Sequence, residues 1–113
     1  MQIRALPKVL ALVAALLAPA ASAHAFGGDW CHVTEVYAFS DRVHVKCNPA
    51  PFAISYFAVP TSNSAVAARF SSMASLMVGG YLWIDYEFFD TSGPSFGCQL
   101  SDCRRALSWK LAE

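Results

Sequence analysis

Charged side chains are scarce and evenly balanced in this sequence. Its 113 residues include eight Lys or Arg and eight Asp or Glu, so the formal net charge is zero. Without a basic excess, the chain lacks the positive footprint that binds a phosphate backbone, which argues against a nucleic-acid-binding protein. Disorder is also excluded, because 56% of the residues are hydrophobic and disordered chains are poor in such residues. The length allows one domain.

An apolar stretch long enough to span a bilayer, about 20 residues, is missing. The longest unbroken one covers residues 9–18, after two basic residues and before a proline and several small residues. This order predicts a secretory signal peptide over residues 1–23, cleaved after Ala23 or Ala25. Residues 24–113 then form a single, mildly acidic domain that is periplasmic or extracellular, with no membrane span once the signal peptide is removed.

Zinc-binding spacing is missing as well, because no Cys-X-X-Cys pair occurs and the three histidines are not spaced like ligands. We therefore expect no metal and no cofactor. Four cysteines in an exported chain favour disulfides, and three connectivities exist. Strand alternation points Cys31 and Cys47 to the interior, which favours a bridge between them across a hairpin. Cys98 and Cys103 would then close a local turn.

The order of apolar patterns predicts strands with a helix between the third and the fourth. Alternation and apolar runs place the strands at residues 31–38, 42–47, 52–59, 81–89 and 106–111. Alternation in the first strand is imperfect, which indicates a bulge. In the second strand Val43 and Val45 share the inner face with Cys47, opposite His44. Residues 90–97 are rich in Gly, Pro and Ser and are expected to form a loop.

The helix is expected over residues 65–78. It carries an apolar stripe at spacings of four, three and four, with Leu76 beside it, made by Val66, Phe70, Met73 and Met77. Ser62 or Ser64 is a suitable cap at its start, and Gly79 with Gly80 provides the exit.

This order of elements is that of the OB-fold, a small five-stranded Greek-key barrel. Closing the sheet into a barrel would also remove the exposed strand edges that a chain of this composition otherwise presents. The alternative is an open α+β sheet with one packed helix. In both folds the protein is mainly β with a single helix, stabilised by its disulfides.

The predicted strand 81–89 has two chemically different faces. Its inward residues are expected to be Leu82, Ile84, Tyr86 and Phe88. The outward set, which ends with Phe89, places aromatic rings beside carboxylates and is our candidate ligand-binding strip: Tyr81, Trp83, Asp85 and Glu87. Aromatic faces stack on the apolar faces of sugars, and carboxylates accept hydroxyl hydrogen bonds. The alternative is that this face lies under the helix or a loop and belongs to the core.

Catalytic patterns are weak, and we expect no enzymatic activity. Asp85 and Glu87 lie two residues apart on one strand face and cannot flank a scissile bond from opposite sides. Asp41 and His44, with Ser40 close by, lack a nucleophile elbow or an oxyanion loop. We therefore interpret these three residues as a solvated turn with a surface histidine.

A second interaction element is the segment 90–105, closed by Cys98 and Cys103. Phe96, Arg104 and Arg105 are its candidate partner-binding residues, and the adjacent arginines suit an anion or a carboxylate of the partner. Such a pair beside a loop is more often a solvent-facing feature. This segment suggests the alternative function, a small periplasmic inhibitor or envelope-stabilising protein that inserts the loop into a partner.

The layout resembles the receptor-binding B subunits of pentameric bacterial toxins of the subtilase-cytotoxin and pertussis-like type. The resemblance rests on the signal peptide, the hairpin ending in residues 43–47 (VHVKC), the helix after the third strand and residues 82–86 (LWIDY). It implies an OB-fold module that binds glycans, forms rings and has no catalytic activity, but no site residue can be carried over individually. The chain is also similar to small uncharacterised exported bacterial proteins in which residues 96–98 (FGC) precede residues 102–104 (DCR). The expected partners are thus a glycan, an envelope protein or further copies of the chain.

Overall fold

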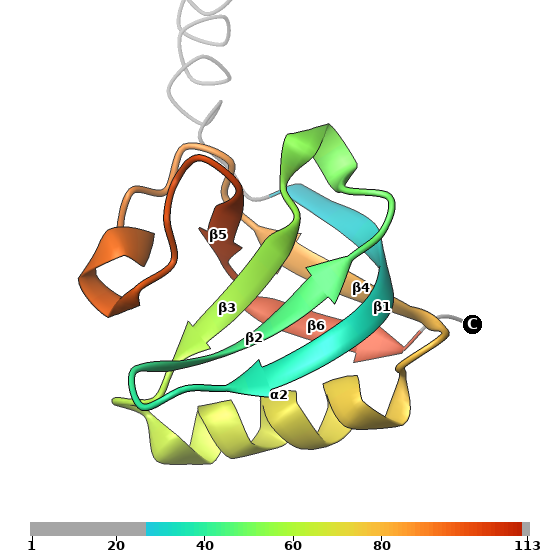
Figure 1. The fold of residues 1–113 in the computed structure, drawn as a ribbon, viewed down its shortest axis with the longest axis horizontal. Coiled ribbons are helices and arrows are strands. Elements are labelled where there is room, and N and C mark those ends of the chain that lie inside the picture. The colour runs from blue at the N-terminus through green and yellow to red at the C-terminus, as the bar shows by residue number, and fades with distance from the viewer. Residues whose placement is uncertain (1–26, 112–113) are drawn as a thin grey trace, which may run out of the picture.

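The computed structural model describes residues 27–111 as a mainly β structure with one α-helix (Figure 1). In chain order its elements are β1 (Gly27–Ala38), β2 (Arg42–Cys47), η1 (Pro51–Ala53), β3 (Tyr56–Pro60), α2 (Ser64–Leu76), β4 (Tyr81–Tyr86), η2 (Gly93–Phe96), β5 (Cys103–Arg105) and β6 (Ser108–Leu111). The mainly β class with one helix is confirmed, although the sheet has six strands instead of five. The expected signal peptide, residues 1–23, lies outside the described residues.

The strands form one curled sheet in the order β5-β3-β2-β1-β4-β6. β1 serves two neighbours: residues 27–32 pair with β4, and residues 33–38 pair with β2. The register shifts between Val33 and Glu35, which confirms the bulge expected in this strand. A bulge bends a strand and increases its twist, so β1 can run along two differently directed partners and the sheet curls (Figure 1).

A short connection links the two edge strands of the sheet. β5 pairs with β3 in parallel and β6 pairs with β4 in antiparallel, and only Ala106 and Leu107 separate β5 from β6. The N–H of Ala106 donates to the Ala58 carbonyl in β3 (2.8 Å), whereas that of Leu107 donates to the Asp85 carbonyl in β4 (2.9 Å). The segment expected as one strand over residues 106–111 therefore divides here between opposite edges of the sheet.

The helix expected over residues 65–78 is confirmed as α2, and it packs on β1, β2 and β3. Phe70 and Ala74 are fully buried, and the rest of the stripe is partly buried against the core. Leu76, expected beside this stripe, is instead 84% exposed. Leu76 is the last residue of α2, and its side chain points away from the sheet.

The helix cap differs from the expected serines. Asn63 occupies the cap position, and its side chain accepts a hydrogen bond from the Val66 N–H (3.2 Å). Gly79 adopts a φ of +87° after the helix, as its place at the expected exit requires.

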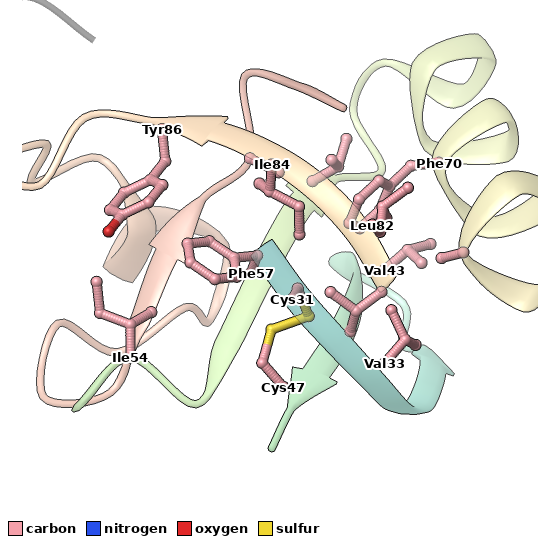
Figure 2. Close-up of a cluster of buried hydrophobic side chains, with 14 of the residues drawn as sticks. Cys31, Val33, Val43, Cys47, Ile54, Phe57, Phe70, Leu82, Ile84 and Tyr86 are labelled. Carbon is pink, nitrogen blue, oxygen red and sulfur yellow. A yellow bond between two sulfur atoms is a disulfide. The ribbon is translucent and has the colours of Figure 1, made fainter. Parts of the chain in front are cut away.

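The core fills the space between the curled sheet and α2 (Figure 2). Phe57, Leu82 and Ile84 are among its fully buried side chains. The Cys31–Cys47 disulfide lies in the same cluster and joins β1 to β2. The pairing that strand alternation favours is therefore confirmed, with both sulfurs facing the interior.

The second disulfide joins Cys98 to Cys103, also as expected. Both cysteines are buried in a smaller apolar cluster with Ala58 and Phe96. All four cysteines are thus bonded, and the second bridge holds the segment after η2 against β3 and β5.

Two expected strands are shorter than the apolar runs that predicted them. The run at residues 52–59 begins with the 3-10 turn η1, so strand pairing starts only at Tyr56. β4 ends at Tyr86 instead of residue 89, and Phe88, expected inside, is exposed. Leu82, Ile84 and Tyr86 do face the core. The inward prediction for this strand is therefore correct as far as its ladder extends and wrong for Phe88.

Candidate functional site

Trp83 stands at the centre of the outer face of β4 in a fixed orientation. Its Nε1–H donates to Asp85 Oδ1 at 2.8 Å. On the neighbouring strand, a Cβ at Gly28 would come within 2.6 to 2.7 Å of three indole atoms. Only a residue without a side chain leaves room for the ring, so one indole face lies on the β1 backbone.

Trp30 on β1 forms a second aromatic wall. The sheet register places it directly opposite Trp83. The two ring centroids are 5.0 Å apart and the planes meet at 77°, while Trp30 is 46% exposed. Edge-to-face contact is a favourable aromatic geometry. The two indoles therefore form a corner that opens to solvent, which we call the indole corner (Trp30 and Trp83).

β6 closes a further side of the indole corner. Lys110 is the register partner of Trp83, and its Nζ lies 5.9 Å from the centre of the indole ring. Leu111 follows it and, with Lys110 and the two indoles, lines a cavity of about 380 Å³. Such a volume lies within the range of small-molecule sites and suits one flat ring.

The Asp85 carboxylate links Trp83 on β4 to Ser108 on β6 through hydrogen bonds. Besides the Trp83 bond, its Oδ2 accepts the Ser108 hydroxyl at 2.6 Å. The hydrogen bonds from Ser108 and Trp83 lower the pKa of the Asp85 carboxyl, so it is ionised at neutral pH. Because each oxygen already accepts a bond from the protein, Asp85 positions Trp83 and has limited remaining capacity to accept bonds from a ligand.

Tyr81 and His32 extend the aromatic surface along the same face. They are register partners, and their ring centroids are 5.0 Å apart. The His32 ring nitrogens lie 3.0 Å from the Asn48 carbonyl oxygen and 3.2 Å from that of Gly79, which fixes the ring plane. Tyr81 is exposed. Three of the four strip residues expected from the sequence, Tyr81, Trp83 and Asp85, thus share one surface.

Glu87, the fourth expected strip residue, lies beyond the end of β4. It is half-buried, and the ladder that aligns the other three no longer fixes its direction. The structure instead adds Trp30, His32 and Lys110. Parity with the inward Cys31 indicates that Trp30 and His32 face outward, but their places beside Trp83 and Tyr81 follow from the β1–β4 register, and that of Lys110 from the β4–β6 register.

The segment proposed to insert into a partner is packed on the protein itself. Phe96 is buried in the small cluster of the second disulfide. The Arg104 guanidinium donates to the carbonyls of Phe88 and Leu100 at 2.6 Å each and to its own neighbour Cys103 at 2.7 Å. Arg105 lies over the Phe96 ring at 5.8 Å. The expectation that the arginines simply face solvent is wrong for Arg104, whose donors bind the backbone.

His44 is not the surface histidine expected from the sequence. It is only 9% exposed and lies 4.7 Å from the Tyr56 ring and 4.9 Å from the Phe39 ring. Burial, and then the neighbouring Arg42 cation, lower the pKa of its imidazole. Asp41 pairs with Arg42 at 2.8 Å instead of with His44. The suggested acid and imidazole pair is therefore not formed.

Two further observations concern residues 27–111. Within this range no cluster of three or more His, Cys, Asp or Glu side chains has the arrangement of a metal site. No helix in the same range is long and apolar enough to cross a membrane.

A larger cavity of about 580 Å³ lies between α2 and β6 and is lined mostly by apolar side chains, among them Met73, Leu76 and Trp109. It lacks the hydrogen-bonded aromatic frame of the indole corner. The indole corner therefore remains the better-defined candidate for a selective ligand site.

Comparisons of the chain with protein-family models, with curated proteins and with solved structures find no match. The functional assignment therefore depends on the geometry of the indole corner.

Proposed function

We propose that this protein is an exported, non-catalytic binding module that recognises a carbohydrate at the indole corner. The observation that carries the proposal is the pair of indoles, whose centroids are 5.0 Å apart and whose planes meet at 77°, with Trp83 fixed by Asp85 and Gly28 and Trp30 partly exposed. A rigid aromatic wall loses little conformational entropy when a ligand binds, which favours affinity.

The chemistry of the indole corner suits a sugar ring. A pyranose has an apolar face of C–H groups, which stacks on an indole, and an edge of hydroxyls. The indoles supply the stacking surface. The Lys110 ammonium, which has three donors and stands over Trp83, is placed to bind hydroxyl oxygens. Together they provide the mixture of aromatic walls and few polar groups that small-ligand sites use.

The proposed architecture is an OB-like barrel. The long β1 shared by β2 and β4, the helix between β3 and β4, and the parallel pairing of β5 with β3 support it. In this proposal β5 and β6 together take the place of the fifth strand, interrupted at Ala106 and Leu107. The resemblance to toxin B subunits adds the proposal that copies of the chain assemble into a ring, which light scattering on the purified protein tests.

Two features support export of this protein: its disulfides and the composition of its N-terminal residues. Two buried disulfides are typical of oxidising compartments, and residues 9–18 have the composition of a signal-peptide core. We therefore place the protein in the periplasm or outside the cell.

The test is a screen of the purified exported protein against immobilised oligosaccharides, followed by calorimetric titration of those that retain it. Trp83→Ala and Trp30→Ala should each weaken binding about tenfold or more, because each removes one stacking wall. Tyr37→Ala is the matched control, since it removes an exposed aromatic ring from the other half of β1. Retention by no oligosaccharide, or equal losses in the control, would contradict the proposal.

The alternative function, insertion of residues 90–105 into a partner, has less support. Phe96 is buried and Arg104 is occupied by backbone carbonyls, so neither is presented to a partner in this conformation. Replacing Phe96 should therefore reduce stability first, whereas a partner-binding role requires lost binding in a variant of unchanged stability.

A further inference from the structure

A polar cavity lies on the outer face of β2 and β3. Its volume is about 250 Å³, and its lining includes Arg42 and His44 from β2 and Tyr56 from β3. The segment 97–103, which joins η2 to β5, supplies the remaining wall with Asp102 among its residues. We call this space the β2–β3 cavity. It shares no lining residue with the indole corner.

Two aromatic rings form the floor of the β2–β3 cavity. The His44 and Tyr56 ring centroids are 4.7 Å apart, and the ring planes meet at 33°. Burial and the Arg42 cation lower the pKa of the His44 imidazole, against the opposing effect of the Glu35 and Asp102 carboxylates. The imidazole is therefore neutral at neutral pH. The floor is thus an uncharged aromatic surface within reach of one cation and one anion.

Arg42 and Asp102 stand at opposite ends of this floor. The β2–β3 register pairs Arg42 with one end of β3, and Tyr56 is the other end of that strand. The Tyr56 N–H donates to the Asp102 carbonyl oxygen at 3.0 Å. Beside Arg42, a Cβ at Gly97 would come within 2.5 Å of the guanidinium Nη1. The segment 97–103, which the second disulfide closes, therefore runs from the cation to the anion.

Both charged groups have capacity for a ligand. Arg42 Nη1 donates to Asp41 Oδ1 at 2.8 Å, but a guanidinium carries five N–H donors. The Asp41 side chain is 48% exposed, and exposed ion pairs are weak. Asp102 forms no ion pair with any other residue between 27 and 111. The β2–β3 cavity thus offers a guanidinium, which suits a carboxylate, and a carboxylate, which suits an ammonium group.

This combination of charges disfavours simple ions. An anion near Arg42 is repelled by Asp102, and a cation near Asp102 is repelled by Arg42, whereas a molecule with both charges is attracted by both groups. The cavity is also smaller than the roughly 300 to 1,000 Å³ of drug-sized sites, so the ligand has few heavy atoms.

We propose that the β2–β3 cavity binds a small zwitterion that carries one ammonium group and one carboxylate. Free amino acids and dipeptides share this chemistry. In the bound state the carboxylate pairs with Arg42, the ammonium group pairs with Asp102, and the carbon atoms between them lie over the rings of His44 and Tyr56. The site is independent of carbohydrate binding at the indole corner.

The test is calorimetric titration of the purified exported protein with glycine, alanine and glycylglycine, and separately with acetate and methylammonium. At least one zwitterion should bind. Acetate and methylammonium should each bind at least about tenfold more weakly than that zwitterion, because each lacks one of the two charge-assisted contacts. Binding of glycine or alanine would identify a free amino acid as the ligand, and binding of glycylglycine alone would identify a peptide.

Asp102→Asn should weaken zwitterion binding about tenfold or more without loss of folding, since it removes the charge and keeps the shape of the side chain. Glu35→Gln is the matched control, because it removes a carboxylate that also acts on His44 but does not line the cavity. Its affinity should stay nearly unchanged. Arg42→Gln should resemble Asp102→Asn, with circular dichroism as the check on its fold.

Three outcomes would overturn the proposal. One is that none of the three zwitterions binds. Another is that acetate or methylammonium binds as tightly as the best zwitterion, because the cavity would then be a site for a simple ion. The third is an equal loss of affinity in the Asp102 and Glu35 variants, which would show a general effect of charge instead of a contact in the β2–β3 cavity.

Discussion

At the scale of single residues, the indole corner depends on a position that has no side chain. Gly28 is needed because the Trp83 ring occupies the space of its missing Cβ. The ring in turn keeps its bond to Asp85 only while it lies flat on β1. A binding surface made of large aromatic residues is thus controlled by a glycine, which a search for ligand-contacting side chains would miss.

Gly28→Ala should displace the indole and weaken both the fold and the proposed carbohydrate binding. Overpacking of this kind costs about 1 to 3 kcal/mol in the free energy of unfolding. Urea denaturation measures that loss, and near-ultraviolet circular dichroism reports the moved indole. Gly27→Ala is the control, since a Cβ there meets only the Tyr86 carbonyl oxygen at 4.0 Å. Equal stability of the two variants would contradict the packing described for Trp83.

His44 should make the stability of the protein depend on pH. Burial and Arg42 lower its pKa in the folded state, while Glu35 and Asp102 act in the opposite direction. The unfolded chain therefore binds a proton more readily, so the contribution of His44 to stability is complete above the unfolded pKa of about 6.5 and is lost as the pH falls through the lower folded value. His44→Phe should flatten thermal stability across this interval. A variant with the same pH dependence as the parent protein would refute this role for His44.

At the scale of elements, the sequence predicted the bounds and inward residues most accurately where the residue pattern belongs to a single strand or a single helix. β2 has the expected bounds, and Leu82, Ile84 and Tyr86 face inward as alternation requires. The prediction fails for Phe88 because β4 has ended and a contact from Arg104, sixteen residues later, fixes that position. Likewise, an apolar run gives no signal that the chain turns at Phe52 with a positive φ.

The candidate site was predictable only in part for the same reason. Parity along one strand identified Tyr81, Trp83 and Asp85, since that information is local. Trp30 and Lys110 join them through the register between β1, β4 and β6, which one sequence does not specify. Sequence reasoning thus found one wall of the site, and the pairing of distant strands supplied the others.

The cap of α2 provides a test at this scale. Asn63→Ala should reduce stability by about 1 kcal/mol, because it leaves the Val66 N–H without its side-chain acceptor. Ser62→Ala and Ser64→Ala replace the two residues that sequence reasoning favoured as caps, and each should change stability by less than about 0.5 kcal/mol. Urea denaturation of the three variants decides between them. A larger loss in either serine variant would contradict the assignment of Asn63.

At the scale of the whole molecule, a small domain combines two stabilising disulfides with an exposed aromatic surface. A chain of this size buries a modest share of its surface on folding, so buried disulfides are a substantial source of stability. One bridge joins β1 to β2 in the main core, and the other secures the segment after η2. This frame allows aromatic rings to remain exposed at the indole corner.

The central claim is that the indole corner is the ligand site. The indole N–H signals in a two-dimensional ¹H–¹⁵N correlation NMR spectrum test this claim most directly. Trp109, whose ring packs on Phe70 at 4.6 Å, serves as an internal reference. On addition of an oligosaccharide that the protein retains, the Trp30 and Trp83 signals should shift while that of Trp109 stays in place. A shift confined to Trp109, or equal shifts of all three signals, would contradict the account.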